Sequence, residues 1–126
     1  MIGGIAGDCQ SGELSQCIFE GLIDISARPS QVYIGGIYGY ETSSRTATLS
    51  HCLSNGIINF SQAPLLESSY MSSYVGGIAG NVYSSSFRYL ISNTKINVSG
   101  TKMLYTGVVV GKTSKTLSYI YGNSTR

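Results

Sequence analysis

Short segments in which apolar and polar side chains alternate recur along the chain. Three of them share one pattern of apolar, polar and apolar residues: Ile23-Asp24-Ile25, Ile58-Asn59-Phe60 and Ile96-Asn97-Val98. An alternation of period two predicts β-strands that bury one face and expose the other. We therefore expect the isoleucines that open these segments to form a buried column, and the central Asp and Asn residues to face solvent.

A glycine motif precedes each of these segments and marks a repeat. Its four copies are Ile2-Gly3-Gly4-Ile5-Ala6-Gly7, Ile34-Gly35-Gly36-Ile37-Tyr38-Gly39, Val75-Gly76-Gly77-Ile78-Ala79-Gly80 and the altered Thr106-Gly107-Val108-Val109-Val110-Gly111. Their starts are 32, 41 and 31 residues apart. A period of this size is typical of repeat architectures. We divide the chain into copies at about 1–32, 33–73, 74–104 and 105–126.

Between the glycine motif and the alternating segment lies a third recurring piece. Its copies are Leu14-Ser15-Gln16-Cys17, Leu49-Ser50-His51-Cys52, Phe87-Arg88-Tyr89-Leu90 and Leu117-Ser118-Tyr119-Ile120. Each copy thus holds three short β-prone pieces, none long enough for a stable sheet alone, and stacking the copies would let equivalent strands pair. The sequence predicts an all-β fold, a parallel β-helix (β-solenoid) of about four coils with three short strands each.

Composition agrees with strands joined by turns. The 126 residues suit one domain, with 42% hydrophobic and 11% charged residues, 16 glycines and no Trp. The apolar segments lack the spacing of three and four that helices need. A sandwich of hairpins would require several tight Asn-Gly turns, and Asn55-Gly56 is the one such dipeptide.

The three cysteines are too few, and odd in number, for a disulfide framework. Cys17 and Cys52 share a column with Leu90 and Ile120, so we interpret them as buried apolar fillers. A disulfide between neighbouring coils is the alternative, because the spacing of adjacent strands, about 4.8 Å, lies within the Cα range of such bonds. Cys9 lies in a turn without a counterpart in the other copies.

Tyr33, Tyr74 and Tyr105 each precede the first glycine of the motif by two positions and should stack as a ladder. Such a ladder stabilises stacked strands, and it is also a candidate ligand-facing surface for sugar rings. His51 takes the place of Gln16 and Tyr89 in the other copies, so we expect it to face outward without a catalytic or metal-binding role.

Charge is unevenly distributed along the chain. All six acids lie in residues 1–67 against two arginines, for a net charge of −4, whereas residues 68–126 carry six Lys and Arg and no acid. The cations are spread singly, so we expect no nucleic acid partner; a basic face around Lys95–Lys115 for nucleic acid or anionic lipid is a weaker alternative.

We expect no catalytic residues, no metal and no cofactor. Gly107–Thr113 resembles a phosphate-binding loop but has three residues between its glycines where four are required. No two carboxylates repeat in one column, as a glycan-cleaving pair would favour. No apolar stretch is long enough to span a bilayer, so we expect no transmembrane segment.

Three glycosylation sequons occur, at Asn59, Asn97 and Asn123. These sequons favour a secreted protein only weakly, because one or two would occur by chance in a chain rich in Ser and Thr. Asn59 and Asn97 belong to the column that we expect to face solvent.

The succession of Gly3-Gly4-Ile5-Ala6-Gly7, Gly12-Glu13-Leu14-Ser15-Gln16-Cys17 and Gly21-Leu22-Ile23 resembles the GLUG repeat of large bacterial and some protist surface proteins. The sequence departs from that repeat at Thr94, where the later glycine is usual, and at Gly107-Val108. The resemblance implies an extracellular, elongated β-solenoid used in adhesion or as a stalk.

We therefore expect a structural and adhesive repeat module of a cell-surface or secreted protein, without catalysis. Its partners would be neighbouring solenoid repeats or domains of the same protein and glycans or proteins of a host or cell surface. The alternative is a carbohydrate-binding or carbohydrate-processing β-helix. The start and end of the chain within repeat material lead us to expect a fragment of a longer solenoid.

Overall fold

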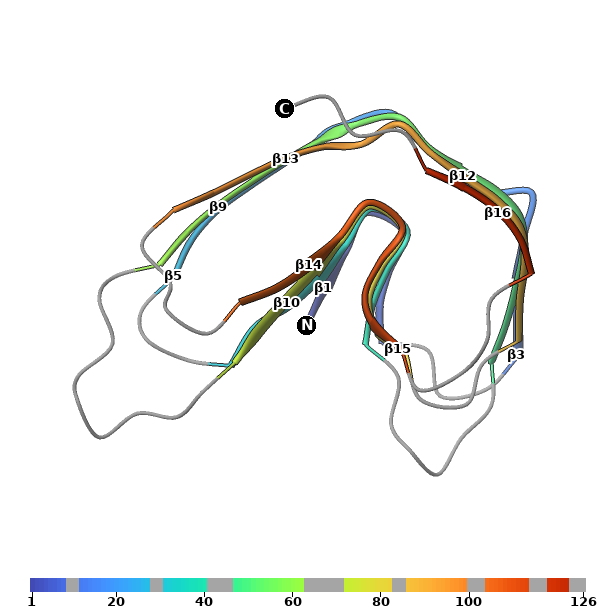
Figure 1. Cartoon of the computed structure of the whole chain (residues 1–126), viewed down its shortest axis with the longest axis horizontal. Coiled ribbons are helices and arrows are strands. Elements are labelled where there is room, and N and C mark those ends of the chain that lie inside the picture. The colour runs from blue at the N-terminus through green and yellow to red at the C-terminus, as the bar shows by residue number, and fades with distance from the viewer. Residues whose placement is uncertain are drawn as a thin grey trace.

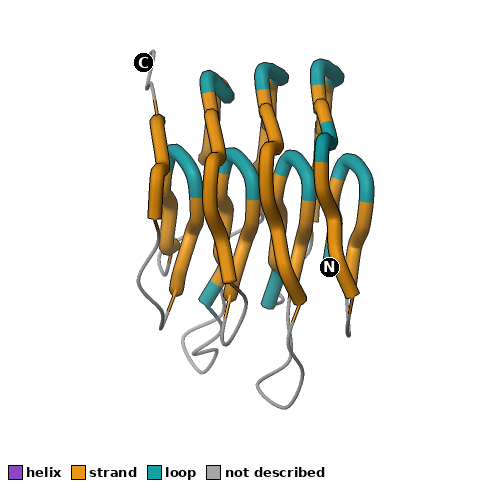
Figure 2. The backbone as a smooth tube through the Cα atoms, turned by 90° about the vertical axis from the view of Figure 1, so that its right-hand side faces the viewer, coloured by secondary structure: helices purple, strands orange, loops and turns teal. Residues whose placement is uncertain are grey.

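The computed structural model describes residues 1–8, 12–27, 31–40, 47–62, 72–82, 86–99, 104–113 and 118–122. Every regular element among them is a β-strand, which confirms the all-β prediction. The chain passes three times through the same series of four parallel sheets, and the described residues of a fourth pass add strands to the first three. Figure 1 looks along the stack and shows the passes lying over one another, and Figure 2 shows them side by side.

The glycine motifs form the first two sheets. The first sheet has the order β1 (Ile2–Gly3), β6 (Tyr33–Gly35), β10 (Ser73–Gly76) and β14 (Leu104–Gly107). The second has the order β15 (Val110–Thr113), β11 (Ala79–Val82), β7 (Tyr38–Tyr40) and β2 (Ala6–Asp8).

The remaining strands form the outer wall. The third sheet has the order β16 (Ser118–Gly122), β12 (Ser86–Ser92), β8 (Ala47–Ser54) and β3 (Gly12–Ser15), and β4 (Ile18–Phe19) also pairs with β8. The fourth has the order β13 (Lys95–Ser99), β9 (Ile57–Gln62) and β5 (Leu22–Ala27). The first pass therefore comprises β1–β5, the second β6–β9, the third β10–β13 and the fourth β14–β16.

Equivalent residues of successive passes are direct neighbours, as the sequence predicts. Ile23 pairs with Ile58, and Ile58 pairs with Ile96, all in parallel strands. Tyr74 likewise pairs with Tyr33 on one side and with Tyr105 on the other. Each strand therefore obtains its main-chain hydrogen bonds from the passes next to it.

The prediction of three strands per pass is wrong, because each glycine motif forms two strands in different sheets. The double glycine is the bend between them, and Figure 1 shows this bend inside the curve of the outer wall. The two arms of the bend lie so close that a Cβ atom at Gly76 would overlap the carbonyl oxygen of Ala79. A Cβ at Gly80 would lie 2.8 Å from the backbone nitrogen of Ile34 in the neighbouring pass. Glycine is required here because the backbones of the two arms touch.

A left-handed residue bends the third sheet at the same point of three passes. Gln16, His51 and Tyr89 have φ values of 54°, 53° and 56°. This conformation is uncommon outside glycine and interrupts the strict alternation of side chains. As a result Leu49 and Cys52, three positions apart, both lie in the core, with 1% and 2% of their surfaces exposed.

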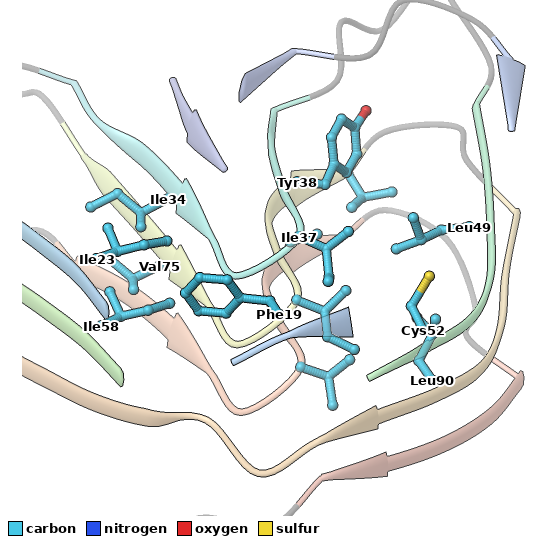
Figure 3. Close-up of a cluster of buried hydrophobic side chains, with 14 of the residues drawn as sticks. Phe19, Ile23, Ile34, Ile37, Tyr38, Leu49, Cys52, Ile58, Val75 and Leu90 are labelled. Atoms are coloured by element: carbon cyan, nitrogen blue, oxygen red, sulfur yellow. The ribbon is translucent and has the colours of Figure 1, made fainter. Parts of the chain in front are cut away.

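The core fills the space between the two glycine arms and the outer wall. Its largest fully buried side chains include Ile34, Ile37, Leu49, Ile58 and Leu90. Figure 3 shows these residues pointing toward one another from both sides. Side chains from all four sheets thus pack into one common core.

Side chains of complementary size meet where the double-glycine bend touches the corner between the third and fourth sheets. The corner positions Phe19, Ser54, Ser92 and Gly122 are in register. A Cβ at Gly4 would overlap the Phe19 ring, whereas Val108, which replaces the second glycine of the motif, lies against Gly122. A large residue on one side of the contact is therefore matched by a glycine on the other.

Three buried hydroxyls from the second and third passes complete this corner. Ser92 Oγ donates to the Val108 carbonyl at 2.6 Å, and Thr94 Oγ1 donates to the Gly77 carbonyl at 3.3 Å. Ser54 Oγ lies 2.6 Å from Thr94 Oγ1, which accepts its proton because the Thr94 proton is already donated. Thr94 thus departs from the glycine of the earlier copies because its hydroxyl joins Ser54 and Ser92 to the bend.

Replacing Thr94 with valine is expected to lower the free energy of unfolding by about 1–3 kcal/mol, because Ser54 and the Gly77 carbonyl lose a buried partner. Urea denaturation followed by circular dichroism measures this change. The matched control is Thr48→Val on the half-buried outer side of β8, where we expect less than about 0.5 kcal/mol. Equal effects of the two substitutions would contradict the network.

Candidate binding surface

The outward side of β5, β9 and β13 carries a column of carboxylate and amide side chains. Asp24, Asn59 and Asn97 stand side by side in register. The Asn97 amide nitrogen donates to the Asn59 amide oxygen at 2.7 Å. This side-chain bond runs along the stack, in the same direction as the main-chain bonds, and holds the two amides in a fixed orientation.

A serine column lies two positions further along the same strands. Ser26, Ser61 and Ser99 are equivalent in register, and the Ser26 and Ser61 hydroxyls are 3.1 Å apart. A shallow groove of about 270 Å³ lies over the two columns. It is lined by Asp24, Asn59, Phe60, Ser61, Asn97, Val98 and Ser99. We call this groove and the two columns the Asx–serine face.

Exposed apolar side chains border the Asx–serine face. Leu22 and Ile57 form the adjacent outward column, with 60% and 41% of their surfaces exposed, and Lys95 continues it. Ile18 and Ile91, on the other side of the corner, are 61% and 44% exposed. This border was not predicted, although an apolar residue directly precedes the buried isoleucine in two copies and was its signal in the sequence.

This arrangement is suited to binding and offers hydrogen-bond partners of several kinds. Amides donate and accept, hydroxyls do both, and the Asp24 carboxylate accepts. The apolar border can contact the nonpolar side of a ligand at the same time. Among the described residues, no group of three or more His, Cys, Asp or Glu side chains is placed to hold a metal ion.

Tyr33 and Tyr74, two members of the predicted tyrosine ladder, stack as the sequence predicts, and the structure places them within the glycine arms. The Tyr33 and Tyr74 rings are parallel, with centroids 5.0 Å apart and an interplanar angle of 4°. The Tyr33 ring also packs against the ring of Tyr40 in the opposing arm, with centroids 4.2 Å apart. Tyr74 is 7% exposed, which leaves little ring surface for a ligand, so the ligand-facing role of Tyr33, Tyr74 and Tyr105 stays a prediction. The Tyr105 side chain lies outside the described atoms.

His51 is exposed on the outer wall, as expected from its column. Its ring stacks on Tyr89 of the next pass, with centroids 4.8 Å apart and an interplanar angle of 25°. Both residues adopt the left-handed conformation, which aims the two side chains outward together. His51 therefore belongs to a second, short aromatic column.

The two internal sequons fall on the Asx–serine face. Asn97 is exposed and Asn59 is half-buried between its neighbours, so the column faces solvent as predicted. Asn123, the third sequon, lies outside the described residues. Glycosylation at any of the three stays a prediction.

The charge asymmetry becomes a gradient along the stack. The described acids Asp8, Glu13, Glu20 and Asp24 are exposed in the first pass, whereas the exposed Arg88 and Lys95 lie in the third.

Within the described ranges, no helix has the length and apolar character required to cross a membrane. Comparison of the chain with protein-family models, with curated proteins and with solved structures finds no match.

Proposed function

We propose that this chain is a segment of a parallel β-solenoid of the GLUG type that serves as a structural and adhesive module. It would be displayed at a cell surface or secreted, and it would bind through its outer wall without performing a reaction. The observation that carries the proposal is the outward register of the Asx and serine columns, which presents a carboxylate or amide group and a hydroxyl group in each of the first three passes. A regular array of this kind suits an extended partner better than a small substrate.

The second candidate function is carbohydrate binding, and the groove of the Asx–serine face favours it. Amide and hydroxyl groups there lie beside exposed aliphatic residues. Sugars present hydroxyls along their edges and C–H groups on their faces, so both parts of this surface have a counterpart. The neutral groups Asn59, Asn97 and Ser61 favour neutral or weakly charged glycans over phosphate-rich partners.

The double variant Asn59→Ala and Asn97→Ala is expected to reduce binding to the partner at least tenfold. The physical reason is that removal of both amides deletes the donors and acceptors of the groove. Binding of the full chain to intact cells and to an array of immobilised glycans measures the effect. Glu13→Ala, on the outer side of β3, serves as the control and should leave binding unchanged.

Surface display is tested independently of the ligand. Antibodies against the chain should label intact, unpermeabilised source cells or detect the protein in the medium. Detection confined to the cytosolic fraction would contradict the proposed location. Unchanged binding of the amide double variant, or an equal loss of binding in Glu13→Ala, would contradict the proposed surface.

A further inference from the structure

The two described cysteines occupy equivalent positions in the first and second passes. The residues on either side of them are paired, with Ser15 opposite Ser50 and Ile18 opposite Leu53. The Leu53 amide donates to the Cys17 carbonyl at 2.9 Å, so the backbones remain bonded at this point. Neighbouring strands are about 4.8 Å apart, which lies within the Cα separation of roughly 4.4–6.8 Å found in disulfides.

Both thiols are free and both lie on the inner side of the third sheet. Cys52 is 2% exposed and its thiol contacts the carbonyls of Ser50 at 3.2 Å and Leu14 at 3.8 Å. Figure 3 shows Cys52 between Leu49 and Leu90. Cys17 packs against the same core but is only partly buried, and its thiol contacts the Ser15 carbonyl at 3.5 Å.

The two sulfur groups also interact with each other. Burial, the largest influence, raises the pKa of the Cys52 thiol above its usual value. The backbone of Cys17 opposes this rise in pKa, whereas the adjacent Cys17 thiol adds to it. The column continues as Leu90 and Ile120, so the thiols form a pair confined to these two passes.

We propose that Cys17 and Cys52 form a disulfide that joins the first pass to the second when the protein meets an oxidising low-molecular-weight disulfide. Cys17 reacts first because it is the more exposed thiol and Cys52 is held protonated in the core. The Cys17 thiolate attacks one sulfur of the small disulfide, which releases one small thiol and leaves a mixed disulfide. Cys52 gives its proton to the small thiolate released in the first step, and its sulfur then attacks the Cys17 sulfur and releases the second small thiol. Two protein thiols are oxidised and one small disulfide is reduced to two thiols.

The bond would hold two stacked passes together through a side chain as well as through the main chain. It closes the stretch of chain between the two cysteines, about one full pass, and so restricts the unfolded chain. The inference is independent of the ligand of the outer wall, because both thiols lie on the inner side. Its failure would therefore leave the proposed function untouched.

The test uses the full chain with Cys9→Ser, which removes the third thiol. This protein is incubated folded with oxidised glutathione, free thiols are alkylated, and peptides are mapped by mass spectrometry. We expect a peptide that links Cys17 to Cys52, a mass loss of two hydrogen atoms, and a rise in melting temperature of several degrees that dithiothreitol reverses. A chain in which both residues remain alkylated, or in which glutathione stays on Cys17, would overturn the proposal.

Two single variants separate the steps of the reaction. Adding Cys52→Ser should trap glutathione on Cys17, because the thiol that would displace it is missing. Adding Cys17→Ser should leave Cys52 unmodified in the folded protein, because it is buried. Circular dichroism confirms that each variant keeps its strands, and modification of Cys52 in the absence of Cys17 would contradict the proposed order of attack.

Discussion

Replacing Gly76 with alanine is expected to lower the free energy of unfolding by about 3 kcal/mol or more, and to prevent folding if the chain is only marginally stable. The added methyl group would overlap the carbonyl oxygen of Ala79 in the opposing arm and would approach the backbone nitrogen of Gly111 to 2.6 Å. Backbone atoms on both sides cannot move aside as a flexible side chain can. Chemical denaturation followed by circular dichroism measures the loss.

Gly7→Ala, at the last glycine of the first copy of the motif, provides the control. A Cβ at Gly7 meets its nearest atom, the Met1 carbonyl oxygen, at 3.2 Å, and the backbone there is at the edge of the stack. We expect a loss of less than about 1 kcal/mol. If Gly76→Ala were tolerated as well as Gly7→Ala, the two arms would not be in backbone contact.

Replacing Ile58 with alanine is expected to lower the free energy of unfolding by about 2–5 kcal/mol, because it leaves a cavity in the centre of the isoleucine column. Ile58 is fully buried, and its neighbours Ile23 and Ile96 belong to the passes on either side. The atoms removed therefore take packing contacts away from three passes at once. Thermal and urea unfolding both report this loss.

The adjacent residue gives the control for this substitution. Ile57 is 41% exposed on the outer wall, so Ile57→Ala should cost less than about 1 kcal/mol. The pair also tests the register, since a shift of one residue would exchange the two environments. A larger loss for Ile57→Ala than for Ile58→Ala would show that the opposite faces are buried.

The columns of the fold could be predicted because equivalent positions of the copies hold the same or similar residue types. Ile23, Ile58 and Ile96 lie side by side as their alternation with polar residues indicates, and Tyr33 and Tyr74 stack as their shared position indicates. Their positions follow because residues at the same place in successive copies pair with one another in parallel strands. The length differences between copies did not disturb the pairing, since equivalent strands align in register wherever both are described.

The path of the chain within one pass was harder to predict. The glycine motif is apolar at nearly every position, so no alternation reveals that it contains two strands and a bend. The left-handed conformation of Gln16 and Tyr89 has no sequence signal, because neither Gln nor Tyr favours it and the surrounding structure imposes it. The Asx–serine face could be predicted through its asparagines, whereas its groove depends on the shape of the sheet.

Equivalent segments of successive passes lie side by side in parallel, and the rest of the fold depends on this arrangement. Nuclear Overhauser contacts between isoleucine methyl groups in selectively labelled protein test it most directly, with each signal assigned through an Ile→Val variant. We expect contacts from Ile58 to Ile23 and to Ile96, since neighbouring strands are about 4.8 Å apart. We expect no contact from Ile58 to the exposed Ile18. Resolved methyl signals without these two contacts would contradict it.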